Sequence, residues 1–194
     1  MTIGRPREFD TDKALAVATQ VFWHQGYEAT SLDHLLRAMD LSKSSFYAAF
    51  GSRDRLFRTC VQHYCDQMLR EMGKALVEAP SGMQFIRDVF ARVIDEARSG
   101  APHGCLLMNS ATELGQRHPE FAEDIRGGIK RFQQVFRQAL IRAQSEGDIP
   151  AEADITGLAD YLTSSLGGVR TMTKAGVGPK AVGAIIKNIL HFAE

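Results

Sequence analysis

The sequence predicts an all-α protein of about nine helices. Apolar residues recur at helical spacing along almost the whole chain of 194 residues, and no segment alternates cleanly enough between apolar and polar residues to predict a strand. Cap residues, glycines and prolines divide this pattern into separate helices. No apolar run approaches the roughly 20 residues that a membrane-spanning helix needs.

Three short helices are expected in the first fifty residues. The first should begin after Asp10 and end at Gly26, and the second should begin after Thr30–Ser31 and end at Asp40–Leu41. The third should begin after Ser42 and end at Gly51. In the third helix, residues 43–50, Phe46 and Phe50 are four residues apart and should both point inward. The small polar residues of that helix are then left on its outer side.

Six more helices are expected in the rest of the chain. Their spans are 52–79, a helix that follows the Ser81–Gln84 capping box, 104–114, 119–146, 154–174 and 179–192. Gly127–Gly128 interrupts the apolar face of the long helix 119–146 and is expected to mark a kink. We therefore expect two domains, residues 1–51 and residues 52–194, connected by the helix 52–79.

Composition excludes several classes of protein. Lys plus Arg and Asp plus Glu both number 23, so nucleic acid would have to be bound by local charge, not by a net field. The three cysteines and six histidines show no spacing typical of a disulfide framework or a metal site. The start of the chain has no secretory signal, which favours a cytoplasmic protein, and no cofactor is expected.

Residues 31–50 have the layout of a helix-turn-helix that reads DNA. A helix that enters the major groove needs a narrow surface with small polar donors near its N-terminus. Lys43, Ser44, Ser45 and Tyr47 meet this requirement on the helix 43–50. The backbone amides at the capped helix starts also supply partial positive charge for phosphates.

The first sixty residues resemble the TetR/AcrR family of transcriptional repressors. The resemblance is carried by Ala18-x3-Phe22-x3-Gly26-Tyr27, by Thr30-Ser31-Leu32, and by Leu41-Ser42-Lys43-Ser44-Ser45-Phe46-Tyr47-x2-Phe50-x-Ser52-Arg53-x2-Leu56. It implies a homodimer that binds a palindromic DNA operator and is released by a small-molecule inducer in the C-terminal domain. Residues 60–194 match only in the number and layout of their helices.

The resemblance also implies which residues contact DNA. Lys43, Ser44, Ser45 and Tyr47 would face the bases, and the phosphates would be held by a second set around the helix starts. That set is Thr30, Ser42, Ser52 and Arg53, with Ser31 beside them. Two departures from the family pattern are Asp40, where glycine is usual, and Ala48–Ala49, where larger residues are common, so base reading should rest on Lys43, Ser45 and Tyr47.

The segment 4–7 precedes the first helix and reads Gly-Arg-Pro-Arg. Proline would hold Arg5 and Arg7 extended, as in an arm that enters the minor groove. The alternative is a solvated tail with no role in binding.

Aromatic and methionine side chains in the C-terminal region could line an inducer pocket, or they could be plain core. The candidates are Tyr64, Met68, Phe90, Met108, Phe132, Phe136 and Tyr161. Cys105 stands at an expected helix start, where amide dipoles could lower the pKa of its thiol and make it a redox or electrophile sensor. The alternative for Cys105 is a small buried apolar residue.

The helices 154–174 and 179–192 are expected to pair with their copies in a homodimer. Their apolar residues exceed what one chain needs to cover, and Gly167–Gly168 would permit close approach. These apolar residues are Leu158, Leu162, Leu166, Val169, Ile185, Ile186, Ile189 and Leu190. The remaining alternative is an all-α enzyme or small-molecule binding protein that does not use its helix-turn-helix, although no catalytic constellation is present in the sequence.

Overall fold

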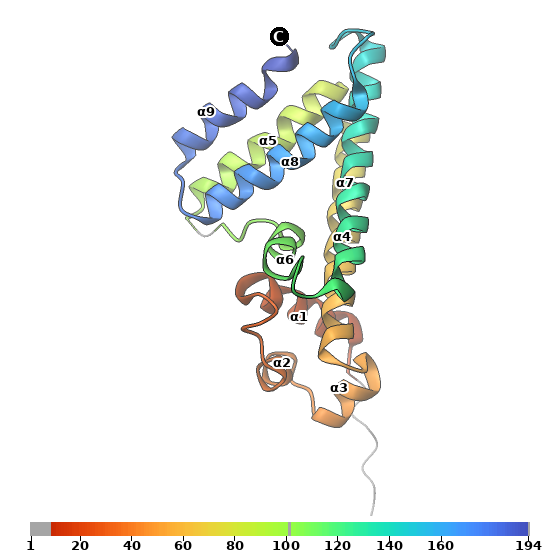
Figure 1. Cartoon of the computed structure of the whole chain (residues 1–194), viewed down its shortest axis with the longest axis vertical. Helices are drawn as coiled ribbons and strands as arrows, with labels where there is room; N and C mark the ends of the chain where they lie inside the picture. Colours follow the sequence, from red (N-terminus) through yellow and green to blue (C-terminus); the bar gives the residue numbers. More distant parts are fainter. Residues whose placement is uncertain (1–8, 101, 194) are drawn as a thin grey trace, which may run out of the picture.

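The all-α prediction is confirmed. The computed structural model describes residues 9–100 and 102–193, and this part of the chain forms nine α-helices and no strand (Figure 1). The helices are α1 (Thr11–Gln25), α2 (Leu32–Met39), α3 (Lys43–Phe50), α4 (Arg53–Glu78), α5 (Gly82–Arg98), α6 (Leu106–Leu114), α7 (Pro119–Glu146), α8 (Ile155–Lys174) and α9 (Pro179–Ile189). A 3₁₀ turn, Leu190–Ala193, follows α9, so the α-helix ends slightly before the expected residue 192.

Helices α1–α3 form a small unit at one end of the molecule (Figure 1). Asp10, Ser31 and Ser42 cap these helices, and each side chain accepts a hydrogen bond from a backbone N–H in the first turn. The unit closes over buried apolar side chains, among them Phe22 and Phe46. Polar caps and a small aromatic core therefore both contribute to this unit.

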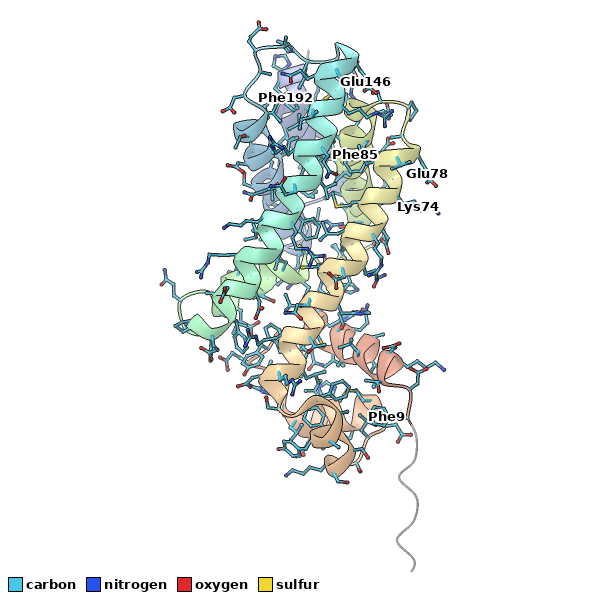
Figure 2. All side chains as sticks on the ribbon, turned by 90° about the vertical axis from the view of Figure 1, so that its right-hand side faces the viewer. Phe9, Lys74, Glu78, Phe85, Glu146 and Phe192 are labelled. Atoms are coloured by element: carbon cyan, nitrogen blue, oxygen red, sulfur yellow. The ribbon has the colours of Figure 1, made fainter. Side chains whose placement is uncertain are left out.

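The long helices α4 and α7 run side by side and connect the small unit to the rest of the protein (Figure 2). Ser52 caps α4, as expected. Helices α5 and α8 pack against this pair at the far end, and α9 packs on α5 and α8. The short helix α6 packs on α1, α4, α7 and α8. One continuous apolar core passes through all of these layers.

Gly127–Gly128 does not end α7, which runs uninterrupted from Pro119 to Glu146. Gly128 instead lets neighbouring helices approach closely. A Cβ atom on Gly128 would lie 2.9 Å from Cδ1 of Leu107 and 3.1 Å from Sγ of Cys65. Gly127 faces open space, since no atom lies within 4 Å of a Cβ built on it.

The capping box at α5 is only half formed. Ser81 accepts a hydrogen bond from the backbone N–H of Gln84 at 3.1 Å, as expected, but the Gln84 amide donates to Asp88 and does not return to Ser81. The second bond at this helix start comes from Glu146, whose Oε2 accepts from the N–H of Gly82 at 2.8 Å. None of the helices in the described ranges is both long enough and apolar enough to cross a membrane.

Candidate nucleic-acid interface and ligand cavity

Helices α2 and α3 form a tight helix-turn-helix. The turn depends on Asp40, which adopts the left-handed conformation with φ 53° and ψ 46°. Among the described residues it is the one non-glycine residue with positive φ. Asp tolerates this conformation better than most residues, so the turn forms without the glycine that is usual in the family.

The outer side of α3 is open to solvent. Lys43 and Ser44 are exposed at the start of the helix, and Tyr47 is 47% exposed one turn later. The other side of the helix carries Phe46 and Phe50, which are buried. The structure therefore exposes three of the predicted base-reading residues, Lys43, Ser44 and Tyr47, whereas Ser45 is half-buried.

The serines at the start of α3 are hydrogen-bonded to one another. The hydroxyl of Ser42 lies 3.0 Å from the hydroxyl of Ser44 and 2.9 Å from that of Ser45, and it also accepts from the backbone N–H of Ser45. Each hydroxyl has one donor and two acceptor positions, so this cluster retains hydrogen-bonding capacity for another group. Ser42 both caps α3 and orders the side chains beside it.

Thr30 does not lie where the sequence pattern predicts. Its side chain is buried, and its hydroxyl donates to the carbonyl of Gly26 at 2.6 Å. Its N–H donates to the carbonyl of Tyr27, and the cap of α2 is Ser31. The expectation that the Thr30 side chain holds a phosphate is wrong, because both of its donors are used inside the protein.

Arg53 is also engaged within the protein. Its guanidinium lies 4.0 Å from the centre of the Tyr27 ring, and Nη1 donates to the carbonyls of Thr30 and Tyr27 at 2.9 and 3.3 Å. The hydroxyl of Tyr27 donates to Asp54 at 2.6 Å. Burial, with this bond to Asp54, raises the pKa of Tyr27 to about 12. Arg53 therefore fixes the loop between α1 and α2. Its neighbour Ser52, by contrast, is exposed at the start of α4 and remains accessible.

The predicted minor-groove residues Arg5 and Arg7 lie outside the described residues.

Sequence reasoning missed the residue that joins this unit to α6. Glu113 is half-buried near the end of α6, and its two carboxylate oxygens accept from the backbone N–H groups of Tyr27 and Glu28 at 3.0 and 2.8 Å. Gly26 makes room for this contact, since a Cβ there would lie 2.7 Å from Glu113 Oε2. No pattern in the sequence pairs residues 85 positions apart, so only the fold reveals these two hydrogen bonds.

His118 makes a second link to the small unit. Its Nε2 lies 2.8 Å from Glu28 in the α1–α2 loop, and its Nδ1 lies 3.1 Å from Glu120. Both ring nitrogens can donate only when the imidazole is protonated. The hydrogen bonds to Glu120 and then to Glu28 raise the pKa of His118 above its usual 6.5.

A raised pKa in the folded state makes the stabilisation by His118 dependent on pH. The contribution is fully present below the unfolded value of 6.5 and is lost as the pH rises through the higher folded value. Replacing His118 with Gln should therefore lower the free energy of unfolding more at pH 5.5 than at pH 8.5. Urea unfolding of both proteins at the two pH values checks this, and an equal loss at both would contradict it.

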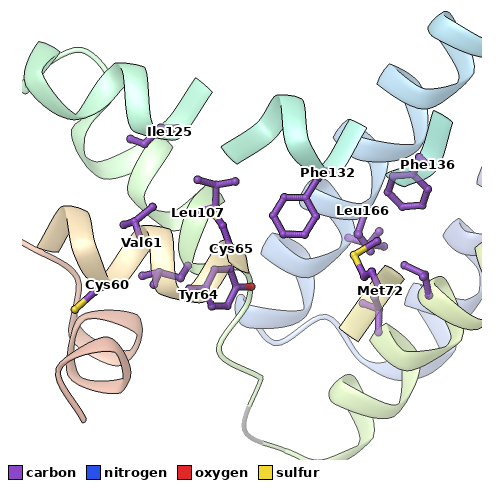
Figure 3. Close-up of a cluster of buried hydrophobic side chains, with 14 of the residues drawn as sticks. Cys60, Val61, Tyr64, Cys65, Met72, Leu107, Ile125, Phe132, Phe136 and Leu166 are labelled. Carbon is purple, nitrogen blue, oxygen red and sulfur yellow. The ribbon is translucent and has the colours of Figure 1, made fainter. Parts of the chain in front are cut away.

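A cavity of about 30 Å³, measured as the space open to the centre of a water molecule, lies in the C-terminal region. Its walls come from the start of α6, the middle of α7 and the second half of α8. The lining residues are Cys105, Leu107, Met108, Ile129, Phe132, Phe136, Thr163, Leu166, Gly167 and Arg170. Figure 3 shows Phe132, Phe136 and Leu166 gathered in this region.

The cavity contains half of the predicted pocket residues. Cys105, Met108, Phe132 and Phe136 line it. The predicted lining residues Tyr64, Met68 and Phe90 do not: Phe90 is fully buried against Phe136, and the Tyr64 hydroxyl reaches only to Cys105, at 3.6 Å from its sulfur. Tyr161 was placed wrongly, because its side chain is 42% exposed on the outer face of α8.

The three cysteines differ in accessibility. Burial raises the pKa values of Cys60 and Cys65 to about 12, so both remain protonated thiols at neutral pH. Cys105 is half-exposed at the N-cap of α6, as expected, and its side chain makes no capping hydrogen bond. Cys105 is therefore the thiol with access to whatever enters the cavity.

The residues exposed on α8 and α9 are not the ones that the sequence pattern predicts. The large aliphatic residues of that pattern are buried or half-buried within the chain, and Gly167 faces Met108 of its own chain, 3.0 Å from a Cβ built there. The exposed stripe of α8 instead carries small residues with two larger ones. It includes Gly157, Tyr161, Ser164, Gly168 and Met172, with the exposed residues Asp160 and Thr171 at its edge.

Two family models match the chain. Residues 14–60 match the model described as "Bacterial regulatory proteins, tetR family", and residues 82–189 match "Tetracyclin repressor-like, C-terminal domain". The second match alone covers more than half of the chain. Together they include α2, α3, the cavity walls and the outer faces of α8 and α9.

Known relatives agree over nearly the whole length. The chain is 31% identical to the HTH-type transcriptional repressor ComR of Escherichia coli (strain K12), over 89% of this chain and 83% of ComR. It is 33% identical to the uncharacterized HTH-type transcriptional regulator YezE of Bacillus subtilis (strain 168), over 84% and 85%. Among solved structures, a cysteine mutant of the TetR family transcriptional regulator CifR, complexed with 26-bp double-strand operator DNA, is similar with a TM-score of 0.81, 32% identity and coverage of 97% and 98%.

Proposed function

The chain belongs to the TetR family of bacterial regulatory proteins, and we propose that it is a homodimeric repressor that releases its operator when a small molecule enters the cavity. The observation that carries this proposal is the free outer face of α3. Lys43, Ser44 and Tyr47 are exposed there on a helix that is otherwise anchored by buried phenylalanines. Such a helix can enter the major groove without any rearrangement of its own fold.

DNA contacts are proposed for the described residues that remain free to make them. Lys43, Ser44, Ser45 and Tyr47 would face base edges, and the exposed caps Ser31, Ser42 and Ser52 would lie at phosphates with the amides of their helices. Arg53 would act by holding the α1–α2 loop in place. The molecule carries no net charge, so affinity depends on this local set.

Selection of binding sites from random-sequence DNA by the purified protein tests the proposal. The expected product is a palindrome whose half-sites lie about 34 Å, or one helical turn, apart. Affinity for it should fall steeply and linearly on a logarithmic salt scale, because phosphate contacts release counterions. Absence of any sequence-selective complex at low salt would rule out the repressor function.

We propose that α8 and α9 form the dimer interface through their exposed stripes. The stripe on α8 repeats at intervals of three or four residues, so its members lie on one side of the helix. Glycine and serine there let a second helix approach closely, and Tyr161 and Met172 supply apolar area at 42% and 40% exposure. On α9, the exposed residues Ala181 and Ala184 are also small, so a second helix could approach closely there as well.

Helix α6 is placed to transmit the presence of a ligand. Its first turn lines the cavity through Leu107 and Met108, and Glu113 in its last turn holds the α1–α2 loop. A ligand that displaces α6 would therefore move the small unit of one protomer relative to that of its partner. Changing the spacing of two recognition helices weakens binding to a site of fixed half-site distance.

Replacing Glu113 with Ala should loosen the small unit. The carboxylate accepts two backbone hydrogen bonds, and a bond to a charged group contributes about 1.5–3 kcal/mol when shielded from water. Because Glu113 is only half-buried, we expect the free energy of unfolding to fall by about 1–3 kcal/mol in total. The Glu113→Gln variant should have a stability between those of the unmodified protein and Glu113→Ala. Urea unfolding measures the loss.

Hydrogen exchange shows whether this loss arises at the contact between Glu113 and the α1–α2 loop. The amides of Tyr27 and Glu28 should exchange faster in Glu113→Ala, and those of the α7 centre should be unchanged. Unaltered protection of the two loop amides would mean that Glu113 does not hold the loop in solution.

A further inference from the structure

Arg170 introduces a charged group into the wall of an otherwise apolar cavity. Its side chain is 18% exposed, and Nη2 donates to Oε1 of Glu96 at 2.5 Å. The Nε atom is shielded from solvent, and none of the described residues accepts a hydrogen bond from it. Arg170 is one of the residues that line the cavity, so its guanidinium, which has a donor without an acceptor, can gain a hydrogen bond from a molecule that enters there.

The rest of the lining limits what that partner can be. Phe132, Phe136 and Leu166 offer apolar contacts. The hydroxyl of Thr163 already donates to the carbonyl of Ala159 at 2.8 Å. A cavity of about 30 Å³ exceeds the roughly 10–15 Å³ that one water needs by only a small factor, so it suits a molecule of a few non-hydrogen atoms.

The charge balance favours a neutral partner. Glu96 already compensates the charge of Arg170, so a carboxylate in the cavity would be an additional, uncompensated buried charge. A carbonyl oxygen accepts the same hydrogen bond without adding charge.

We propose that the cavity binds a small neutral carbonyl compound whose oxygen accepts a hydrogen bond from the guanidinium of Arg170. Its short alkyl part packs against Phe132, Phe136 and Leu166. This assignment rests on the proposed function, because it gives the chemical class of the inducer that the cavity would take. Arg170 then selects the ligand by its acceptor, and the aromatic residues select it by size.

Calorimetric titration of the full-length protein with four probes of similar size tests the assignment. The probes are butanone, its isostere 2-methyl-1-butene, which has CH₂ in place of the oxygen, butyrate and butylamine. On the unmodified protein, butanone should bind at least about tenfold more tightly than each of the other three, which corresponds to one well-placed hydrogen bond in a site of low polarity.

Two variants separate the roles of the ion pair. Arg170→Met keeps the apolar stem, and it should reduce the preference for butanone over the alkene to less than about twofold. Glu96→Gln retains Arg170 but leaves its charge uncompensated, so butyrate should gain at least about tenfold relative to butanone. Circular dichroism confirms that each variant is folded, and Glu96→Gln still tests the assignment if Arg170→Met does not fold.

Equal binding of butanone and the alkene, no binding of butanone, or unchanged selectivity in Glu96→Gln would each overturn the assignment. Operator binding by the same protein samples without any probe reports separately on the proposed repressor function. A protein that binds its operator but shows no carbonyl preference would refute only the ligand class. A protein with carbonyl preference but no operator would refute only the repressor.

Discussion

Operator affinity is expected to fall by at least about 100-fold when Lys43 and Tyr47 are both replaced by Ala, since each base contact contributes about 1–3 kcal/mol. Both side chains are exposed on α3, so their removal leaves the buried anchors Phe46 and Phe50 in place. A dimer loses each contact twice. Fluorescence anisotropy with the selected operator measures the loss, and thermal unfolding should show an almost unchanged protein.

The single variants distinguish base reading from phosphate binding. A Lys43 that reads a base loses discrimination at one operator position when it is replaced, whereas a Lys43 that holds a phosphate weakens binding to all sequences and reduces the salt slope by about 1. Lys74→Ala is the matched control, because Lys74 is an exposed lysine on α4 that pairs with Glu78. Full operator affinity in the double variant would show that α3 is not the reading helix.

Replacing Gly168 with Arg should convert the protein to a monomer and remove tight operator binding. A Cβ at this position meets nothing within 4 Å in its own chain, so the protomer itself can accept a side chain. In the proposed dimer, however, the same side chain would place a charge between two closely packed helices. A monomer carries a single reading helix, and we expect its operator affinity to fall by at least about 1,000-fold, because the second half-site no longer contributes.

Gly127→Arg is the matched control for this test. Gly127 is likewise a helical glycine with open space around its Cβ, but it lies on the exposed side of α7. In both variants arginine has a more favourable helix propensity than glycine, by roughly 1 kcal/mol. The two variants therefore differ only in the surface that they alter. Sedimentation velocity should show a monomer for Gly168→Arg and a dimer for Gly127→Arg; a dimer in both would place the interface elsewhere.

The sequence by itself determined the local structure of this protein. Helix starts at Asp10, Ser31, Ser42 and Ser52 follow from side chains that cap backbone amides within three residues. The outward position of Ser44 and Ala48 follows from the helical period once Phe46 and Phe50 are recognised as core. Lys43 is exposed because it is the first residue of the helix. These features depend on neighbours a few residues away, and sequence spacing reports such neighbours directly.

Only the tertiary structure decided how distant residues are paired. Thr30 and Arg53 resemble phosphate ligands in sequence, yet the fold uses their donors on the carbonyls of the α1–α2 loop. Glu113 and Arg170 carry no local signal, because their partners lie 85 and 74 residues away.

The same limit explains the errors on α8. A helical stripe shows that one face is buried but not whether the covering surface belongs to the same chain or to a partner. The fold places Gly167 against its own Met108 and leaves Gly168 and Tyr161 outside. The physical reason is that packing is set by which helices meet and at what rotation, and neither quantity is encoded in the spacing of a single helix.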